Sequence, residues 1–190
     1  MTDLADLLTS VRTHYVDMFE AALAELREKG HTIIIEPPMV DAQGALAREG
    51  ELNLGARYDL ATVEGEGAKP SMFSPSRMLD FEPEAFHGAG LDIVIAPFQW
   101  DHVSIAIEGE PKAVAVALAE WFDGAIGAPA DVRPDDIQRA AHFLSDPIVE
   151  ERTTRVQADF GTADVYIVMA LFDQLRLAGA SRVEFGLPDS

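Results

Sequence analysis

The chain contains no cysteine among its 190 residues. This absence excludes a disulfide framework, zinc ribbons, iron-sulfur clusters and cysteine nucleophiles. Basic residues are also scarce, because 14 Lys and Arg stand against 33 Asp and Glu, for a formal net charge of -19. A surface so acidic repels phosphate groups, so we expect the protein to bind neither nucleic acid nor anionic membranes.

Long apolar segments and targeting signals are missing as well. The longest unbroken apolar run covers only eight residues, Val165 to Phe172, against the ~20 that a membrane-spanning helix needs. The first residues include Asp3 and Asp6, where a secretory signal would carry basic residues. The sequence therefore predicts a cytoplasmic protein that does not cross a membrane.

The composition is otherwise that of a globular protein, with 48% hydrophobic and 25% charged residues. A chain of this length can bury one sizeable core without covalent staples. We therefore expect residues 1–190 to form a single domain.

Hydrophobic periodicity predicts the main elements. An apolar stripe with helical spacing indicates a long N-terminal helix over residues 3–29, and similar patterns indicate helices over 111–126, 134–145 and 162–178, the last with Thr162 as its N-cap. Short β-branched or alternating runs indicate strands over 31–36, 56–63, 91–98, 103–108 and 181–187. The pattern leaves 148–160 open between strand and coil. Residues 39–55 and 65–90 lack a period and are predicted to be loops.

The order of these elements favours an α+β fold over a doubly wound α/β fold, because strands group before helices. The predicted fold is a mainly antiparallel sheet of four to six strands with helices packed on one face. The strands 91–98 and 103–108, joined by a short turn, are expected to form an antiparallel hairpin.

Familiar catalytic signatures are absent from the sequence. The glycine-rich stretch at 64–67 resembles a phosphate loop only weakly, because Pro70 follows Lys69 where such a loop needs Ser or Thr. No Gly-x-Ser-x-Gly element occurs. His142 and Asp146 are spaced to share one face of the predicted helix 134–145 and are a weak metal-binding pair. No cofactor and no catalytic residue follow from these motifs.

The densest group of chemically capable residues lies in the turn between the two predicted hairpin strands. Trp100, Asp101 and His102 offer an indole, a carboxylate and an imidazole at one point. A divalent metal bound there would use Asp101 and His102, with His87 as the third ligand by residue type. An organic ligand would stack on Trp100, although an indole below a turn more commonly completes the core.

The aromatic-rich segment 70–88 is too apolar to be left exposed, so we expect it to lie against the sheet and to border the main pocket or contact surface. Phe73 and Phe81 are its candidate ligand-binding residues.

Three functions stay open at this point. The charge and the missing motifs favour a protein-interaction module, an inhibitor or immunity-type partner that binds a basic protein. The alternatives are a hydrolytic or metal-dependent enzyme and a small-ligand binder, each with a site near Trp100, Asp101 and His102. The apolar helix 162–178 further predicts a homodimer, because it leaves little polar face for solvent.

Overall fold

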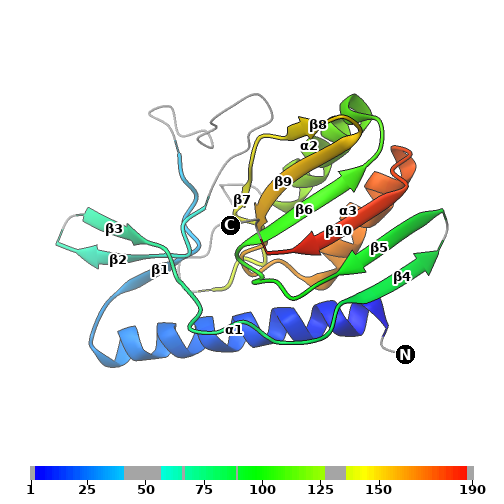
Figure 1. The fold of residues 1–190 in the computed structure, drawn as a ribbon. Coiled ribbons are helices and arrows are strands. Elements are labelled where there is room, and N and C mark those ends of the chain that lie inside the picture. Colours follow the sequence, from blue (N-terminus) through cyan, green and yellow to red (C-terminus); the bar gives the residue numbers. More distant parts are fainter. Residues whose placement is uncertain (1–2, 41–56, 66, 89, 127–135, 188–190) are drawn as a thin grey trace.

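The computed structural model describes residues 3–40, 57–65, 67–88, 90–126 and 136–187. Within these ranges the chain forms three helices and ten strands, arranged as a three-stranded and a seven-stranded sheet. The fold is α+β, as predicted, and Figure 1 shows the long N-terminal helix running along one edge of the molecule. Most of the predicted loop 39–55 lies outside the described residues.

Helix α1 spans Leu4–Glu28 and confirms the N-terminal helix. It begins where the side chain of Asp3 accepts a hydrogen bond from the backbone N–H of Ala5, at 2.9 Å. It ends before Gly30, which adopts a φ of 83° that a helix cannot continue. Its buried stripe is formed by the apolar residues Leu7, Leu8, Val11, Tyr15, Phe19 and Leu23.

The smaller sheet contains β1 (Ile33–Ile35), β2 (Leu60–Glu64) and β3 (Gly67–Ser71), all antiparallel. It packs against the C-terminal half of α1 through a separate small core formed by Phe19, Leu23, Ile33, Ile35 and Leu60. Strand β3 lies in the segment 65–90, so the prediction of one long loop there was wrong. This strand is exposed along its whole length, which explains why it shows no hydrophobic period.

The larger sheet runs in the order β4-β5-β10-β6-β9-β7, with β8 also paired to β9. Its strands are β4 (Glu84–Gly88), β5 (Leu91–Ile95), β6 (Val103–Glu108), β7 (Phe143–Leu144), β8 (Ile148–Glu150), β9 (Thr153–Asp159) and β10 (Arg182–Gly186). The sheet is mixed, because β10 is parallel to β5 and antiparallel to β6. The expected single sheet of four to six mainly antiparallel strands is therefore corrected to two sheets.

The predicted hairpin between 91–98 and 103–108 was also wrong. Strand β10, from the end of the chain, lies between β5 and β6 and pairs with both. The turn itself exists, because His102 donates its backbone N–H to the carbonyl of Gln99 at 3.0 Å. It connects β5 to β6, which are not neighbours in the sheet because β10 lies between them.

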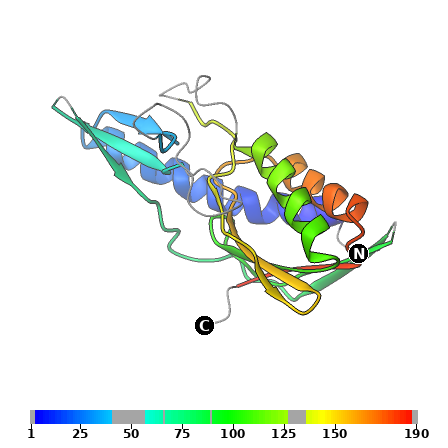
Figure 2. The same cartoon turned by 90° about the horizontal axis from the view of Figure 1, so that it is seen from above.

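Helices α2 (Pro111–Ala125) and α3 (Val165–Leu177) lie on the same face of the larger sheet, and α1 lies on that side too (Figure 2). The main core fills the space between them. At its centre is a group of packed aromatic rings from Phe98, Trp100, Phe160, Phe172 and Phe185.

The helix predicted over 134–145 does not form in the described part of that segment. Residues 136–142 are irregular and lead into β7. The backbone N–H groups of Gln138 and Arg139 donate to the side chains of Glu36 and Thr162 instead of to helical carbonyls. Arg139 also adopts a φ of 56°, which a right-handed helix excludes.

The last helix begins slightly later than predicted. Its N-cap is Asp164, whose side chain makes no capping hydrogen bond, and Thr162 is engaged elsewhere. Tyr166 and Leu177 remain largely exposed on α3, so the helix does have a solvent-facing side, and the homodimer stays a prediction. No described helix is long and apolar enough to cross a membrane.

Candidate functional site

Four ionisable side chains are buried together between the two sheets. Glu36, Asp59, His142 and Asp159 expose 0%, 1%, 0% and 7% of their surface. They follow β1, precede β2, precede β7 and end β9, respectively. Figure 1 shows these strand ends converging near the middle of the molecule. Since a charged group is seldom fully buried without a purpose or a partner, this cluster is the candidate site.

The His142 imidazole lies at the centre of the cluster. Its Nε2 lies 2.6 Å from Glu36 Oε1, in a buried hydrogen bond. Its Nδ1 lies 3.1 Å from Asp59 Oδ1 and 3.5 Å from Asp159 Oδ2. Neither of these two oxygens meets the geometry of a hydrogen bond, so Nδ1 is buried without a hydrogen-bond partner. Buried polar atoms are seldom left in that state.

Glu36 is also held by donors other than the imidazole. The Thr162 hydroxyl lies 2.8 Å from each of its carboxylate oxygens. The backbone N–H of Gln138 donates to Oε2 at 2.5 Å. Burial disfavours the charged carboxylate, but these contacts and His142 outweigh it and lower the pKa of Glu36.

Asp59 and Asp159 are each held by a hydrogen bond from the backbone. Asp59 Oδ2 accepts a hydrogen bond from the Phe73 backbone N–H at 2.6 Å, and Asp159 Oδ1 accepts one from the Gly161 N–H at 2.7 Å. The other oxygen of each carboxylate is the one that faces His142 Nδ1. Each aspartate is therefore oriented by its own backbone donor.

Proton affinities in the cluster are strongly coupled. Burial opposes protonation of His142, but the charges of Asp159, Asp59 and Glu36 prevail and raise its pKa well above the usual value. Burial likewise raises the pKa of Asp159, against the opposing effect of His142. Arg57, also buried, binds the backbone carbonyls of Ile126 and Glu36 rather than a carboxylate. Three carboxylates thus share few positive charges.

Gly161 permits the close packing of this centre. A Cβ at this position would lie 2.3 Å from the His142 ring and 2.6 Å from the Ala140 carbonyl oxygen. Its φ of 50° is also in the left-handed region that favours glycine. The turn after β9 can therefore cross the imidazole only because residue 161 has no side chain.

The turn residues singled out by the sequence have three different environments. Trp100 is 1% exposed and packs on Phe98 and Phe160 in the core. His102 is exposed. Asp101 is half-buried, its Oδ1 has no hydrogen-bond partner, and burial together with the charge of Asp159 raises its pKa to about 7. Of the three, Asp101 is thus electrostatically linked to the buried cluster.

His87 does not join these residues. Its Nδ1 lies 2.8 Å from Asp92 Oδ1, across the pair of strands β4 and β5. The sheet register aligns Asp92 with Arg182 and Arg182 with Glu108, at the far end of β6 from His102. Six residues of strand correspond to ~20 Å, too far for a shared ion. The structure therefore does not bring together the metal ligands His87, Asp101 and His102.

Apolar side chains of the segment 70–88 pack against both cores, in part next to the cluster, whereas a border with the main pocket stays a prediction. The Phe73 ring contacts Tyr15 and Phe19, at centroid distances of 5.8 and 5.4 Å, while its N–H holds Asp59. Phe81 is half-buried against the main core. A ligand-binding role for Phe73, Phe81, Trp100 and the other predicted residues stays a prediction.

Most residues of the buried cluster were not predicted from the sequence. His142 was considered, but with Asp146 on a helix that does not form. Glu36, Asp59, Asp159 and Thr162 are isolated polar residues at the ends of strands, and no spacing rule links four such positions. The only local signals were the Glu36-Pro-Pro ending and the glycine at 161 directly before Thr162.

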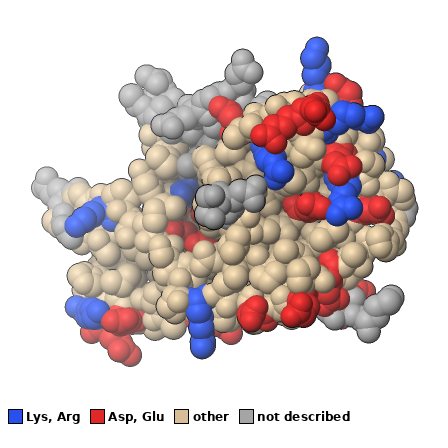
Figure 3. All heavy atoms as spheres, viewed as in Figure 1, with Lys and Arg blue, Asp and Glu red and all other residues tan. Residues whose placement is uncertain are grey.

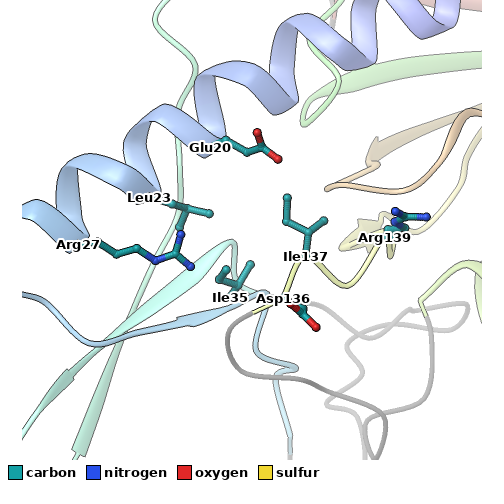
Figure 4. A pocket seen from close by; sticks show the side chains of 7 residues that line it. All are labelled: Glu20, Leu23, Arg27, Ile35, Asp136, Ile137 and Arg139. Atoms are coloured by element: carbon teal, nitrogen blue, oxygen red, sulfur yellow. The ribbon is translucent and has the colours of Figure 1, made fainter.

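A separate open pocket lies between α1 and the segment 136–139. Its volume is about 750 Å³. Figure 4 shows the side chains that line it, with Glu20, Leu23 and Arg27 coming from α1 and Ile35, Asp136, Ile137 and Arg139 from the opposite side. The lining combines an apolar floor with both signs of charge.

Comparison of the chain with protein-family models, with curated proteins and with solved structures found no match.

We predict that Gly161→Ala destabilises the protein much more than Gly179→Ala. Both glycines have positive φ, but the added Cβ at 179 meets nothing within 4 Å. Gly179→Ala, the control, should lower the free energy of unfolding by about 1–2 kcal/mol through backbone strain. Gly161→Ala should lower it by about 3–5 kcal/mol, because the His142 ring must also move. Urea unfolding measures both values, and equal costs would contradict the close packing.

We also predict that Asp101→Asn stabilises the chelator-treated protein at pH 8 but not at pH 4. The raised pKa of about 7 means that Asp101 ionises less readily in the folded than in the unfolded chain. The natural protein therefore loses stability as the pH rises from about 4 to about 7.

A shift of this size corresponds to about 4 kcal/mol at most, and solvent at the half-buried carboxyl reduces the expected gain to about 1–2 kcal/mol. Urea unfolding across this pH range measures the gain, with Asp17→Asn on the exposed face of α1 as the control. A gain that does not depend on pH would contradict the assignment.

Proposed function

We propose that this protein is an acidic interaction module that binds a basic segment of another protein along the free edge of β4. The observation that carries this proposal is the position of β4 at the end of the larger sheet, next to a group of carboxylates.

The outer edge of β4 is available for pairing. Within the described ranges, β4 pairs with β5 alone. Ala85, His87 and Gly88 are exposed on it. An edge strand presents backbone N–H and C=O groups that an extended peptide can bind, with affinity from the backbone and specificity from neighbouring side chains.

Carboxylates predominate around this edge, which Arg12 and Arg77 flank. Residues 3–11 and 78–88 contain five carboxylates and neither Lys nor Arg: Asp3, Asp6, Asp80, Glu82 and Glu84. Leu4 and Leu7 of α1 belong to the same large core as Phe81 and Phe86. Figure 1 shows the start of α1 next to β4, and Figure 3 shows acidic side chains along this lower edge. A basic partner would be steered towards it.

The test uses a fluorescent peptide of alternating Lys and Val, which is basic and favours an extended conformation. We expect Glu82→Lys with Glu84→Lys to weaken its binding tenfold or more in anisotropy titrations at low salt. The matched control, Glu28→Lys with Glu120→Lys, makes the same change in net charge at exposed positions on α1 and α2. It should weaken binding about twofold, through the long-range field alone. Equal losses of affinity in the two variants, or no binding of the peptide by the natural protein, would contradict binding along the edge of β4.

A small-ligand function is a second candidate, favoured by the pocket in Figure 4. Leu23, Ile35 and Ile137 offer an apolar floor, and the charged lining suits a zwitterion such as an amino acid with an apolar side chain. Thermal-shift measurements with leucine and phenylalanine test this function. We expect a rise in melting temperature that Arg27→Ala abolishes and that Lys29→Ala, outside the pocket lining, retains.

A further inference from the structure

The three atoms that converge between Asp59, His142 and Asp159 have the spacing of metal ligands. Two atoms bound to one tetrahedral ion at about 2.1 Å lie ~3.4 Å from each other. Nδ1 of His142 lies 3.1 Å from Asp59 Oδ1 and 3.5 Å from Asp159 Oδ2. All three atoms lie within 4.8 Å of one another. Both contacts are short enough for a hydrogen bond, but neither has the alignment that a hydrogen bond requires, so Nδ1 is left without such a partner.

The remaining atoms of each ligand are already engaged by the protein. His142 has its Nε2 on Glu36, an arrangement in which the carboxylate fixes the ring and leaves Nδ1 as the ligand atom. Backbone N–H groups fix the second oxygen of Asp59 and of Asp159. Each side chain therefore presents one donor atom to a common point, and of these atoms Asp59 Oδ1 also accepts a long hydrogen bond of 3.4 Å from the Tyr15 hydroxyl.

The charge of the cluster calls for a cation. Glu36, Asp59 and Asp159 are buried carboxylates. The hydrogen bonds that Arg57 donates go to the backbone carbonyls of Ile126 and Glu36 and not to these carboxylates. Burying unbalanced carboxylates costs several kcal/mol per ion. A divalent ion bound by two of them would supply two positive charges at the place where His142 Nδ1 lacks a hydrogen bond.

We propose that Asp59, His142 and Asp159 bind a divalent transition-metal ion, with Glu36 as the outer-shell partner of His142. One imidazole and two carboxylates suit zinc, manganese or cobalt better than calcium or magnesium, which prefer oxygen ligands throughout. The ligands come from segments next to β2, β7 and β9, so the ion would connect the smaller sheet to the larger one. This site is independent of the edge of β4.

The experiment is a calorimetric titration of the chelator-stripped full chain with zinc, repeated with cobalt while following its visible absorption. We expect one ion per chain and a higher melting temperature in the presence of either metal. The visible spectrum should be typical of cobalt with a low coordination number. Asp59→Asn and Asp159→Asn keep the shape of the side chain and should each weaken zinc binding at least tenfold. Glu36→Gln should weaken it about 10–100-fold through the orientation of His142.

The control variants are Asp17→Asn, an exposed acid on α1, and His87→Ala, which removes the exposed pair with Asp92. Both should retain the affinity of the natural chain. Circular dichroism without metal identifies variants that fail to fold, and the titration of the natural chain is decisive by itself. No saturable binding of zinc or cobalt by that chain would overturn the proposal, as would binding that both aspartate variants retain.

A second measurement separates the metal site from a buried imidazolium. Nitrogen NMR of the His142 ring distinguishes a ring protonated at both nitrogens from one bound to metal through Nδ1. We expect the Nδ1 resonance to shift on addition of one equivalent of zinc, with the Nε2 proton retained. An Nδ1 that stays protonated with zinc present would show that the cluster is an ion-pair network and would overturn the proposal.

Discussion

The hydrogen bond between His142 and Glu36 is the interaction on which the junction of the two sheets depends. It connects residues separated by 106 positions, at 2.6 Å and without contact with solvent. Glu36 also binds Thr162 and the Gln138 backbone, so one carboxylate organises the end of β1, the entry to β7 and the turn before α3. Removing one partner of such a buried pair commonly costs 3–5 kcal/mol, because the other is left charged and unpaired.

The backbone near this interaction is unusual as well. Three non-glycine residues in the described chain have positive φ, and two of them, Glu36 and Arg139, belong to the segments that meet at the cluster. Gly161 adds a third left-handed position in contact with His142. Strain of about 1–3 kcal/mol per residue persists only where the surroundings fix it, and it gathers at functional sites. The conformation of these turns thus supports the inference that the cluster has a role beyond packing.

Local patterns predicted the elements whose residues alternate between core and solvent, and they failed where distant partners decide the structure. Helix α1 and strand β6 have clear periods, and both were predicted closely. The position of β10 between β5 and β6 is set by contacts with the end of the chain, which no local pattern contains. Residues 136–142 have helical composition, but the side chains of Glu36 and Thr162 bind the N–H groups of Gln138 and Arg139, and the N–H groups of Ala141 and His142 donate to the carbonyls of Ala125 and Asp159. The cluster was missed for the same reason, since its side chains come from four separate segments.

The acidic residues near β4 and those of the buried cluster differ in their contact with solvent. Those near β4 are exposed or, for Glu84, half-buried, so salt at physiological concentration screens their field beyond ~8 Å. Asp59 and Asp159 are buried, and ions in solution screen them much less. Raising the ionic strength should therefore weaken contacts made by the surface while leaving the interior cluster almost unchanged. The net charge of -19 is consequently no guide to the cluster, whose properties depend on a few desolvated groups and on the ion or proton that balances them.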